Sequence, residues 1–383
     1  MINLAYKDIT HSFVKFIVTA MGVGMLLGIV LIMMGVYRGM VTDAQVMLDD
    51  IGADLWIVQE DTLGPFAESS RIHEDLKNTL RVNPDIDKSA ALAFLNLQVK
   101  TPEGVMRRVY SVGYDPHGDI SAINPKRLVD GRALEKSHYE IVVSKKLGFS
   151  LNDKIKLGRN IYTVVGITEG AVSSGGDPVI YVSLKDAQEL QFLYSNARIR
   201  NDRARGMKVD ADNHLVNAVV ATLKGGSDPD DVAKTIRRWK HLSVYTAEQQ
   251  RNILTKNVIE TASKQIGMFT VILVGVSSII IALIIYTMTL EKIKEISIMK
   301  LVGLPNFMIT KMIMQETLTL GVLAFIFGNL FAHAIWDKFP KRVVLQIPDA
   351  WALFGIIIVA SILASLFGVY KAIKADPRAA IGG

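Results

Sequence analysis

Few residues in this sequence have the types and spacing of a catalytic, nucleotide or metal site. The chain has 383 residues and no cysteine, which excludes disulfides, thiolate nucleophiles and cysteine-based metal sites. It contains no G-x-x-x-x-G-K-[ST] phosphate loop and no H-E-x-x-H or G-x-S-x-G signature. The run Ser173-Ser174-Gly175-Gly176-Asp177 lacks the lysine of a phosphate cradle, so we interpret it as a surface loop. We therefore expect no enzyme activity, no cofactor and no resident metal.

The residues that could do chemistry lie mostly in apolar stretches. Glu316 and His333 belong to the third such stretch, and ionisable residues inside a membrane often mark a transport pathway. A structural role near the membrane interface is the competing interpretation for both. The first stretch is rich in methionine, including Met21, Met25 and Met33. Methionine can ligate haem iron or copper, but adaptable packing is its more frequent role.

These residues must be positioned by membrane helices. Four uncharged apolar stretches exceed or approach the roughly 20 residues that cross a bilayer as a helix, and the mean hydropathy of +0.29 fits such spans joined to a polar domain. The sequence predicts an α-helical membrane protein with an inserted α+β extracytoplasmic domain. Its parts are a cytoplasmic amphipathic lead-in at 1–15, transmembrane helices at 16–40, 264–290, 311–336 and 350–372, the inserted domain with its stalk at 41–263, a cytoplasmic helix at 291–310, a short outer loop at 337–349 and a cytoplasmic tail at 373–383.

The distribution of positive charge predicts the orientation. Lysines and arginines gather beside the spans, so the positive-inside rule accounts for the formal net charge of +6 without a nucleic-acid partner. The lead-in, the 291–310 segment and the tail are basic, which places both termini in the cytoplasm. Lys338 and Arg342 in the outer loop argue the other way, but the majority of the flanking charge favours this orientation.

The inserted domain has mixed strand and helix patterns. Leu92–Lys100 and Val105–Val112 predict a hairpin around the turn Thr101-Pro102-Glu103-Gly104. Further strands are predicted at Ile141–Ser144, Lys154–Leu157 and Tyr162–Ile167, and helices at Leu184–Leu193 and Asp230–Arg238.

Small residues recur on the first span. Ala20, Gly24 and Gly28 are spaced four apart and so lie on one helix face. Such a pattern lets two helix backbones approach closely. It predicts a helix contact, either within one chain or across a dimer.

The most informative stretch is Glu291–Met308, directly after the second span. A short helix is predicted here, with an apolar face and a charged one. The apolar residues are Ile293, Ile296, Met299, Leu301 and Val302, and the charged ones are Lys292, Lys294, Glu295 and Lys300. Gly303 and Pro305 end this helix. Such a helix suits docking into a groove on a partner, and an interfacial helix without a partner is the competing interpretation.

This stretch resembles a segment of the permease subunits of MacB/FtsX-type ABC transporters, a group with DevC-, HrtB- and LolC-like members. The family pattern E-R-x-x-E-I-G-x-x-K-A-x-G-A has lysine for arginine at Lys292 and serine for glycine at Ser297. The resemblance continues in order along the chain. Matching stretches are Gly131-Arg132, Ile141–Ser144, Leu147-Gly148, Tyr162–Ile167, Gln315-Glu316 and Ala375–Ala380.

The resemblance implies a permease in the bacterial inner membrane. Two copies, or one with a paralogue, would join a separate ABC ATPase, in some members with a periplasmic adaptor. ATP-driven movement would reach the outer domain mechanically and export or extract a hydrophobic or amphipathic cargo such as haem, lipid, lipoprotein or peptide. An FtsX-like signalling scaffold, which controls an extracytoplasmic partner, is the alternative. The implied ATPase-coupling residues are Glu291, Lys292, Glu295, Ile296, Met299, Lys300 and Gly303.

Overall fold

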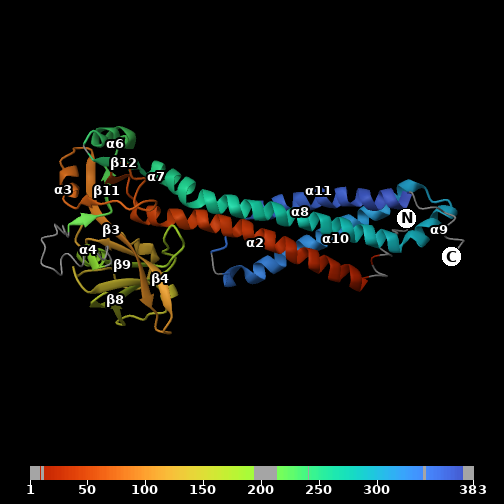
Figure 1. Cartoon of the computed structure of the whole chain (residues 1–383), viewed down its shortest axis with the longest axis horizontal. Helices are drawn as coiled ribbons and strands as arrows, with labels where there is room; N and C mark the ends of the chain where they lie inside the picture. Colours follow the sequence, from red (N-terminus) through yellow and green to blue (C-terminus); the bar gives the residue numbers. More distant parts are fainter. Residues whose placement is uncertain (1–8, 10–12, 194–213, 240, 340–341, 374–383) are drawn as a thin grey trace. The chain divides into compact units, whose positions relative to one another are not determined.

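The chain divides into two compact units, which Figure 1 shows in a computed structural model. The structure describes residues 9, 13–193, 214–239, 241–339 and 342–373. One unit combines Met1–Gly39 with Ala262–Gly383, and the other is Met40–Thr261. We call them the membrane unit and the inserted domain. Most of the predicted lead-in at 1–15 and of the tail at 373–383 lies outside the described residues.

Long apolar helices build the membrane unit. They are α2 (Phe13–Ile51), α8 (Glu260–Glu291), α10 (Asn306–Ile335) and α11 (Ile347–Ile373), with the short α9 (Ile293–Leu301) between α8 and α10. By length and composition, four helices can cross a membrane within the described residues, which confirms the predicted spans. Their apolar windows fall in Phe13–Ile51, Lys264–Glu291, Asn306–Lys338 and Ile347–Tyr370.

All four spanning helices extend past the predicted bounds of their spans, and the extensions of α2 and α10 are the largest. α2 continues to Ile51, because no proline or glycine interrupts it between Met40 and Gly52, where φ is +62°. α10 begins at Asn306 because Pro305 precedes it in an extended conformation that cannot continue a helix. Proline and glycine therefore set these ends, and hydropathy does not.

The inserted domain is built on a 10-stranded mixed sheet. Its order is β12-β1-β11-β3-β4-β9-β6-β8-β5, with β7 paired to β8. The strands are β1 (Leu55–Gln59), β3 (Ile86–Lys100), β4 (Met106–Tyr114), β5 (Leu128–Gly131), β6 (Glu140–Ser144), β7 (Lys154–Leu157), β8 (Asn160–Thr168), β9 (Val179–Ser183), β11 (Ala218–Leu223) and β12 (Leu242–Thr246). The short strands β2 (Ile72–His73) and β10 (Leu215–Val216) form a separate pair.

Helices complete the domain at both faces of this sheet. They are α3 (Leu76–Leu80), α4 (Leu184–Leu193), α6 (Pro229–Arg237) and α7 (Ala247–Ile253), followed by a π-helical segment (Leu254–Ile259) that leads into α8. Short 3₁₀ turns occur at Pro125–Arg127 and Lys145–Leu147. The helix-and-strand composition confirms the predicted α+β domain.

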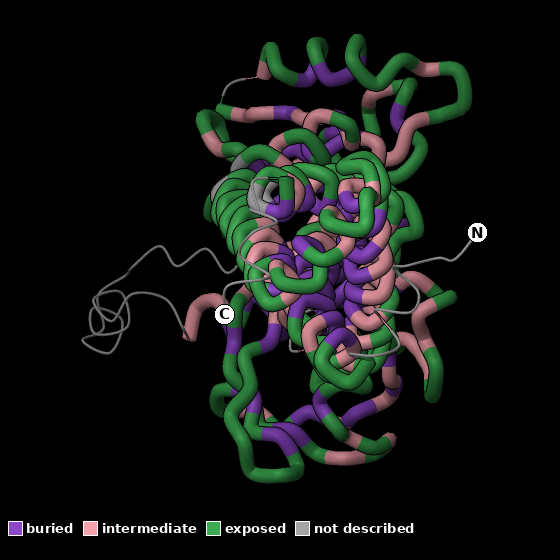
Figure 2. Tube along the Cα trace, turned by 90° about the vertical axis from the view of Figure 1, so that its right-hand side faces the viewer, coloured by how far each residue is buried: buried purple, intermediate pink, exposed green. Residues whose placement is uncertain are grey.

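Period-two alternation of the strands produces two cores. On β1, Leu55 and Ile57 join one buried cluster, whereas Trp56 and Val58 join the other. The first cluster includes side chains of α4 and α6, and the second includes the end of α2. Because both faces of the sheet meet a core, β6 and β9 are buried along their whole length. Figure 2 colours the trace by burial. The helices therefore cover both faces of the sheet, which explains the domain's independent hydrophobic core.

Candidate functional site

The segment after the second span forms a separate helix with defined ends. α8 stops at Glu291, and Lys292 (φ −91°, ψ 6°) breaks the helix before α9 begins. At the other end Gly303 adopts φ +94°, a conformation that favours glycine. The Gly303 N–H donates to the Lys300 carbonyl and the Leu304 N–H to the Met299 carbonyl, both at 3.0 Å. These two bonds are a Schellman motif, and they fix where α9 turns back toward α10.

Two lysines fasten the edges of this segment to the first and last spans. Lys15 Nζ on α2 lies 2.6 Å from Glu291 Oε1 at the end of α8, and both side chains are exposed. Lys300 Nζ on α9 donates to the carbonyls of Ala372 and Ile373 at 2.9 and 2.7 Å. These carbonyls belong to the last turn of α11, where unpaired carbonyls and the helix dipole favour a cation.

A third lysine joins α9 to the third span inside the bundle. Lys292 Nζ lies 3.2 Å from Glu316 Oε2 on α10, and the two side chains are only 14% and 7% exposed. The structure thus brings together two residues that the sequence assigned to different roles, coupling and pathway. Because the segment follows α8 directly in the chain, it is connected to all four membrane helices.

The two faces of α9 differ in burial. Ile296 and Ser297 are fully buried within the chain, so the Ile296 side chain is covered by the protein's own helices. Lys294 and Glu295 point to the exposed side. Periodicity alone indicated an apolar face but could not tell which neighbour covers it.

Large apolar side chains extend from the exposed side of the turn between α9 and α10. Val302 and Phe307 are 76% and 75% exposed. The sequence pattern placed Val302 on the apolar face of this helix but did not identify Phe307, and both residues flank the predicted stop at Gly303 and Pro305. Ile298, Leu301 and Met308 add to the same exposed apolar surface. We call this set, Ile298, Leu301, Val302, Phe307 and Met308, the outward apolar surface.

The small residues of the first span pack against the third span of the same chain. A Cβ atom added to Gly24 would lie 2.7 Å from the Ala324 carbonyl oxygen, and one added to Gly28 would lie 2.7 Å from that of Gly328. Ala20 is fully buried. Backbones this close leave no room for a side chain, so α2 and α10 are in direct contact. The role of these residues in a dimer stays a prediction.

His333 lies far from Glu316 on the same helix. At about 1.5 Å of rise per residue the two are roughly 25 Å apart, so they do not form one site. His333 Nδ1 donates to the Asn329 carbonyl at 2.9 Å. It lines a cavity of about 620 Å³ with apolar walls from residues such as Phe325 and Trp351. Within the described residues, no group of three histidine, aspartate or glutamate side chains could hold a metal ion.

In the inserted domain, the predicted Gly131-Arg132 motif holds a buried carboxylate. Arg132 Nη2 lies 2.6 Å from Glu140 Oε1, and the backbone N–H groups of Glu135 and Lys136 donate to Glu140 Oε2. Burial opposes ionisation, but these hydrogen bonds outweigh it and lower the pKa of Glu140 to about 2. Glu140 is therefore a charged structural group that joins β6 to the preceding loop.

Four membrane helices, a large α+β domain between the first two, and a short helix between the second and third define a polytopic membrane protein of a recognisable class. The sequence profile of the MacB-like periplasmic core domain matches residues 16–239, and that of the FtsX-like permease C-terminal family matches residues 267–377. The chain belongs to this family: it is an ABC transporter permease of the MacB/FtsX type.

Relatives with the same architecture span the whole chain. An uncharacterized ABC transporter permease of Mycobacterium tuberculosis is 23% identical over 384 residues, which cover 100% of both chains. A protein of Staphylococcus epidermidis named as the hemin transport system permease HrtB is 23% identical over 402 residues, covering 100% of this chain and 99% of that one. Among solved structures, the periplasmic region of MacB from Actinobacillus actinomycetemcomitans aligns at a TM-score of 0.36 and 10% identity, over 54% of this chain and 94% of that chain.

Proposed function

We propose that this chain couples ATP hydrolysis by a separate ABC ATPase to movement of the inserted domain, and so exports or extracts a hydrophobic or amphipathic cargo. The observation that supports this most strongly is the attachment of the segment from Glu291 to Lys300 to the other three spans: Lys15–Glu291 joins the end of α8 to α2, Lys292–Glu316 joins the break to α10, and Lys300 joins α9 to α11. A force applied to a helix fastened in this way reaches the whole bundle. In this proposal α9 and both termini face the cytoplasm of a bacterial inner membrane.

The ATPase would contact the exposed side of α9 and the turn that follows. The outward apolar surface provides contact area, and Lys294 and Glu295 provide charged groups beside it. Exposed apolar residues surrounded by charge are typical of protein interfaces. Ile296 would act from the inside by holding α9 against the bundle, while Met299 and Gly303 shape its C-terminal turn.

The cargo and the second subunit follow from the family. Relatives named as hemin permeases favour haem among the amphipathic cargoes. We expect such a cargo to bind in the apolar cavity beside His333. A dimer, either of two copies or with a paralogue, would double the four helices around it, and membrane lipid would surround them.

Reconstitution with the co-purifying ATPase tests the coupling role. The measured quantity is ATP hydrolysis with and without the permease in lipid nanodiscs. Val302→Asp should abolish the stimulation, because a charge in the centre of an apolar interface is desolvated without a partner. Full stimulation by a folded Val302→Asp protein would contradict docking at this surface.

A haem titration separates the cargo question from the coupling question. A shift of the Soret band on adding haem to the purified permease, lost in His333→Ala, would support haem as cargo. Absence of a shift would remove haem and leave the ATPase coupling intact. An FtsX-like scaffold would show stimulated hydrolysis without any dependence on an added cargo.

A further inference from the structure

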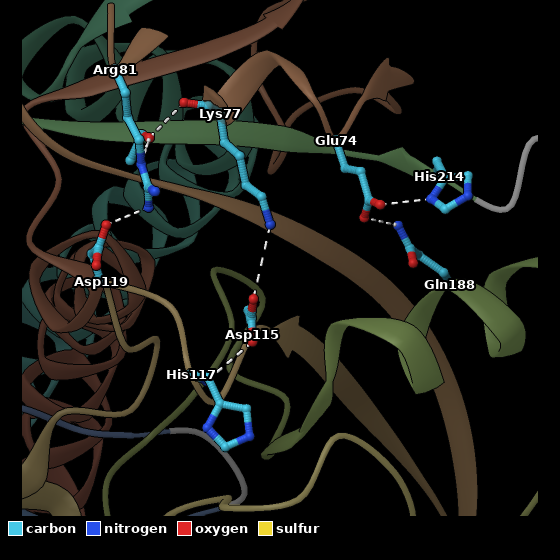
Figure 3. A network of polar contacts seen from close by, with 9 residues as sticks. Glu74, Lys77, Arg81, Asp115, His117, Asp119, Gln188 and His214 are labelled. Carbon is cyan, nitrogen blue, oxygen red and sulfur yellow. Dashed lines mark hydrogen bonds and ion pairs between the residues drawn. The ribbon is translucent and has the colours of Figure 1, made fainter. Parts of the chain in front are cut away.

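The inserted domain holds a polar cavity of about 650 Å³ that the proposed function does not use. It lies within one compact unit, and separate parts of the chain line it: α3, the loop after β4, the segment before β6, the start of α4, and residue 214 before β10. Figure 3 shows part of this cluster: Lys77 of α3 points toward Asp115 in the loop after β4, and Gln188 of α4 and His214 point toward Glu74.

The carboxylates of two acidic residues in this region are already bonded on both oxygens. Glu74 binds His214 Nδ1 at 2.6 Å through Oε1 and accepts from Gln188 Nε2 at 2.9 Å through Oε2. Asp186 is fully buried. Its Oδ1 lies 2.8 Å from His138 Nδ1, and its Oδ2 accepts a hydrogen bond from the backbone N–H of Tyr139. Each oxygen of these two carboxylates therefore already accepts one hydrogen bond from the protein.

The other two acids that line the cavity are also engaged. Asp115 accepts the backbone N–H of His117 at 3.1 Å, and the Glu189 carboxylate accepts from Asn160 Nδ2 at 3.2 Å. Lys77 Nζ lies 3.9 Å from Asp115 Oδ2, which is an ion-pair distance but too long for a hydrogen bond. Lys77 is therefore close to Asp115 but does not donate a hydrogen bond to it.

The unused hydrogen-bond donors in the cavity belong to basic groups. Within the residues that the structure describes, the side chains of Lys185 and His117 form no hydrogen bond or ion pair, and both line the cavity. His138 donates its Nδ1 hydrogen to Asp186, so Nε2 of the same ring is left for a ligand. Lys77 adds ammonium donors that its loose pairing with Asp115 does not use.

We propose that this cavity binds the anionic oxygen group, a phosphate or a carboxylate, of a ligand. Lysine ammonium groups and protonated histidines form charge-assisted hydrogen bonds with such oxygens, and these are stronger than neutral ones. The carboxylates of Glu74 and Asp186 hold the side chains of His214 and His138 in place. This site lies outside the membrane unit and goes beyond ATPase coupling and cargo movement.

Calorimetric titration of the full-length protein in phosphatidylcholine nanodiscs, with inorganic phosphate or succinate as the probe, tests the proposal. We expect saturable binding that Lys185→Ala weakens by about tenfold, with a larger loss in the Lys77→Ala, Lys185→Ala double variant. Lys88→Ala and Lys126→Ala, at exposed lysines away from the cavity, are the matched controls and should bind as wild type. No saturable heat up to about 10 mM probe, or equal affinity in Lys185→Ala, would overturn the proposal.

Chemical protection provides a second measurement that needs no variant. Phosphate should slow acetylation of Lys185 but not of Lys126, as followed by mass spectrometry. Nanodiscs of phosphatidylglycerol without added phosphate distinguish the two sources of the group. Protection there assigns a lipid headgroup, and protection only with added phosphate assigns a soluble ligand. If Lys185 reacts at the same rate in every arm, the site does not bind an anion.

Discussion

Lys292 Nζ, at the break between α8 and α9, lies 3.2 Å from Glu316 Oε2 on α10, where both side chains are largely buried. An isolated buried charge is strongly unfavourable, so each residue requires the other. The pair consequently fixes the start of α9 against the third span. It is the innermost of the three lysine contacts that hold the segment.

Reversing one charge of this pair should damage both stability and coupling. Lys292→Glu or Glu316→Lys places two like charges together in a buried site, at a cost of about 3–5 kcal/mol. The double variant Lys292→Glu, Glu316→Lys should recover most of the melting temperature and part of the ATPase stimulation. Lys294→Glu, at an exposed position on the same helix, is the control. Additive losses in the double variant would rule out a direct pair.

Substitutions of Ile296 and Phe307 should affect different properties, stability in the first case and ATPase stimulation in the second. Ile296 is fully buried and Phe307 is 75% exposed. Ile296→Ala should lower the free energy of unfolding by about 2 kcal/mol or more, because it leaves a cavity in the bundle. Phe307→Asp should leave the melting temperature unchanged and abolish stimulation of the ATPase. Thermal unfolding in detergent and hydrolysis assays on both variants check this, and a destabilised Phe307→Asp would count against the assignment of faces.

Adding a side chain at Gly28 should separate α2 from α10. The Cβ atom of Gly28→Leu would lie 2.7 Å from the Gly328 carbonyl oxygen, which is backbone and cannot rotate away. We expect a loss of several degrees in melting temperature. Gly22→Leu is the matched control on the same helix, because no atom lies within 4 Å of its added Cβ. Equal melting temperatures for the two variants would contradict the close packing.

Acid should weaken the loop that Glu140 joins to β6. The pKa of Glu140 is about 2 in the folded protein and about 4.3 in an unfolded chain. A lowered pKa stabilises the fold fully above the unfolded value, and this stabilisation, on the order of 3 kcal/mol, is lost as the pH falls from about 4.3 to about 2. Hydrogen exchange of β6 should therefore accelerate across this window in the wild type.

Two variants distinguish the effect of Glu140 on hydrogen exchange from the effects of neighbouring acidic residues. Glu140→Gln should show faster exchange already at pH 7 and no further change between pH 5 and pH 2, within about 1 kcal/mol. Glu135→Gln, whose carboxylate is 69% exposed and 3.5 Å from Arg132, should behave as wild type. A wild-type acid profile in Glu140→Gln would assign the effect to another group.

The sequence predicted the features that depend on local pattern. The Thr101–Gly104 turn lies between β3 and β4, with Gly104 at φ +83° as a tight turn requires. The predicted bounds of Lys154–Leu157 and Leu184–Leu193 are those of β7 and α4. In each case neighbouring residues contain the whole signal.

Features that depend on distant pairing were not predictable. Leu55–Gln59 was not identified as a strand, because its partners β11 and β12 lie far along the chain. In the candidate site, the helical pattern of 291–308 was clear. The Lys292–Glu316 contact was not, since it depends on the helix break at Lys292 and on the path of α10. The inward position of Ile296 follows from the same packing.

The three lysine contacts around α9 differ in their access to water, and this gives the segment unequal stiffness. Lys15 and Glu291 are 54% and 59% exposed, so dissolved ions compete with their attraction, whereas the interior contact of Lys292 is shielded from them. Raising the ionic strength therefore loosens the side toward α2 and leaves the side toward α10 firm. In the proposed coupling, a higher salt content of the surroundings would therefore reduce how much of the ATPase-driven movement reaches the first span through Lys15.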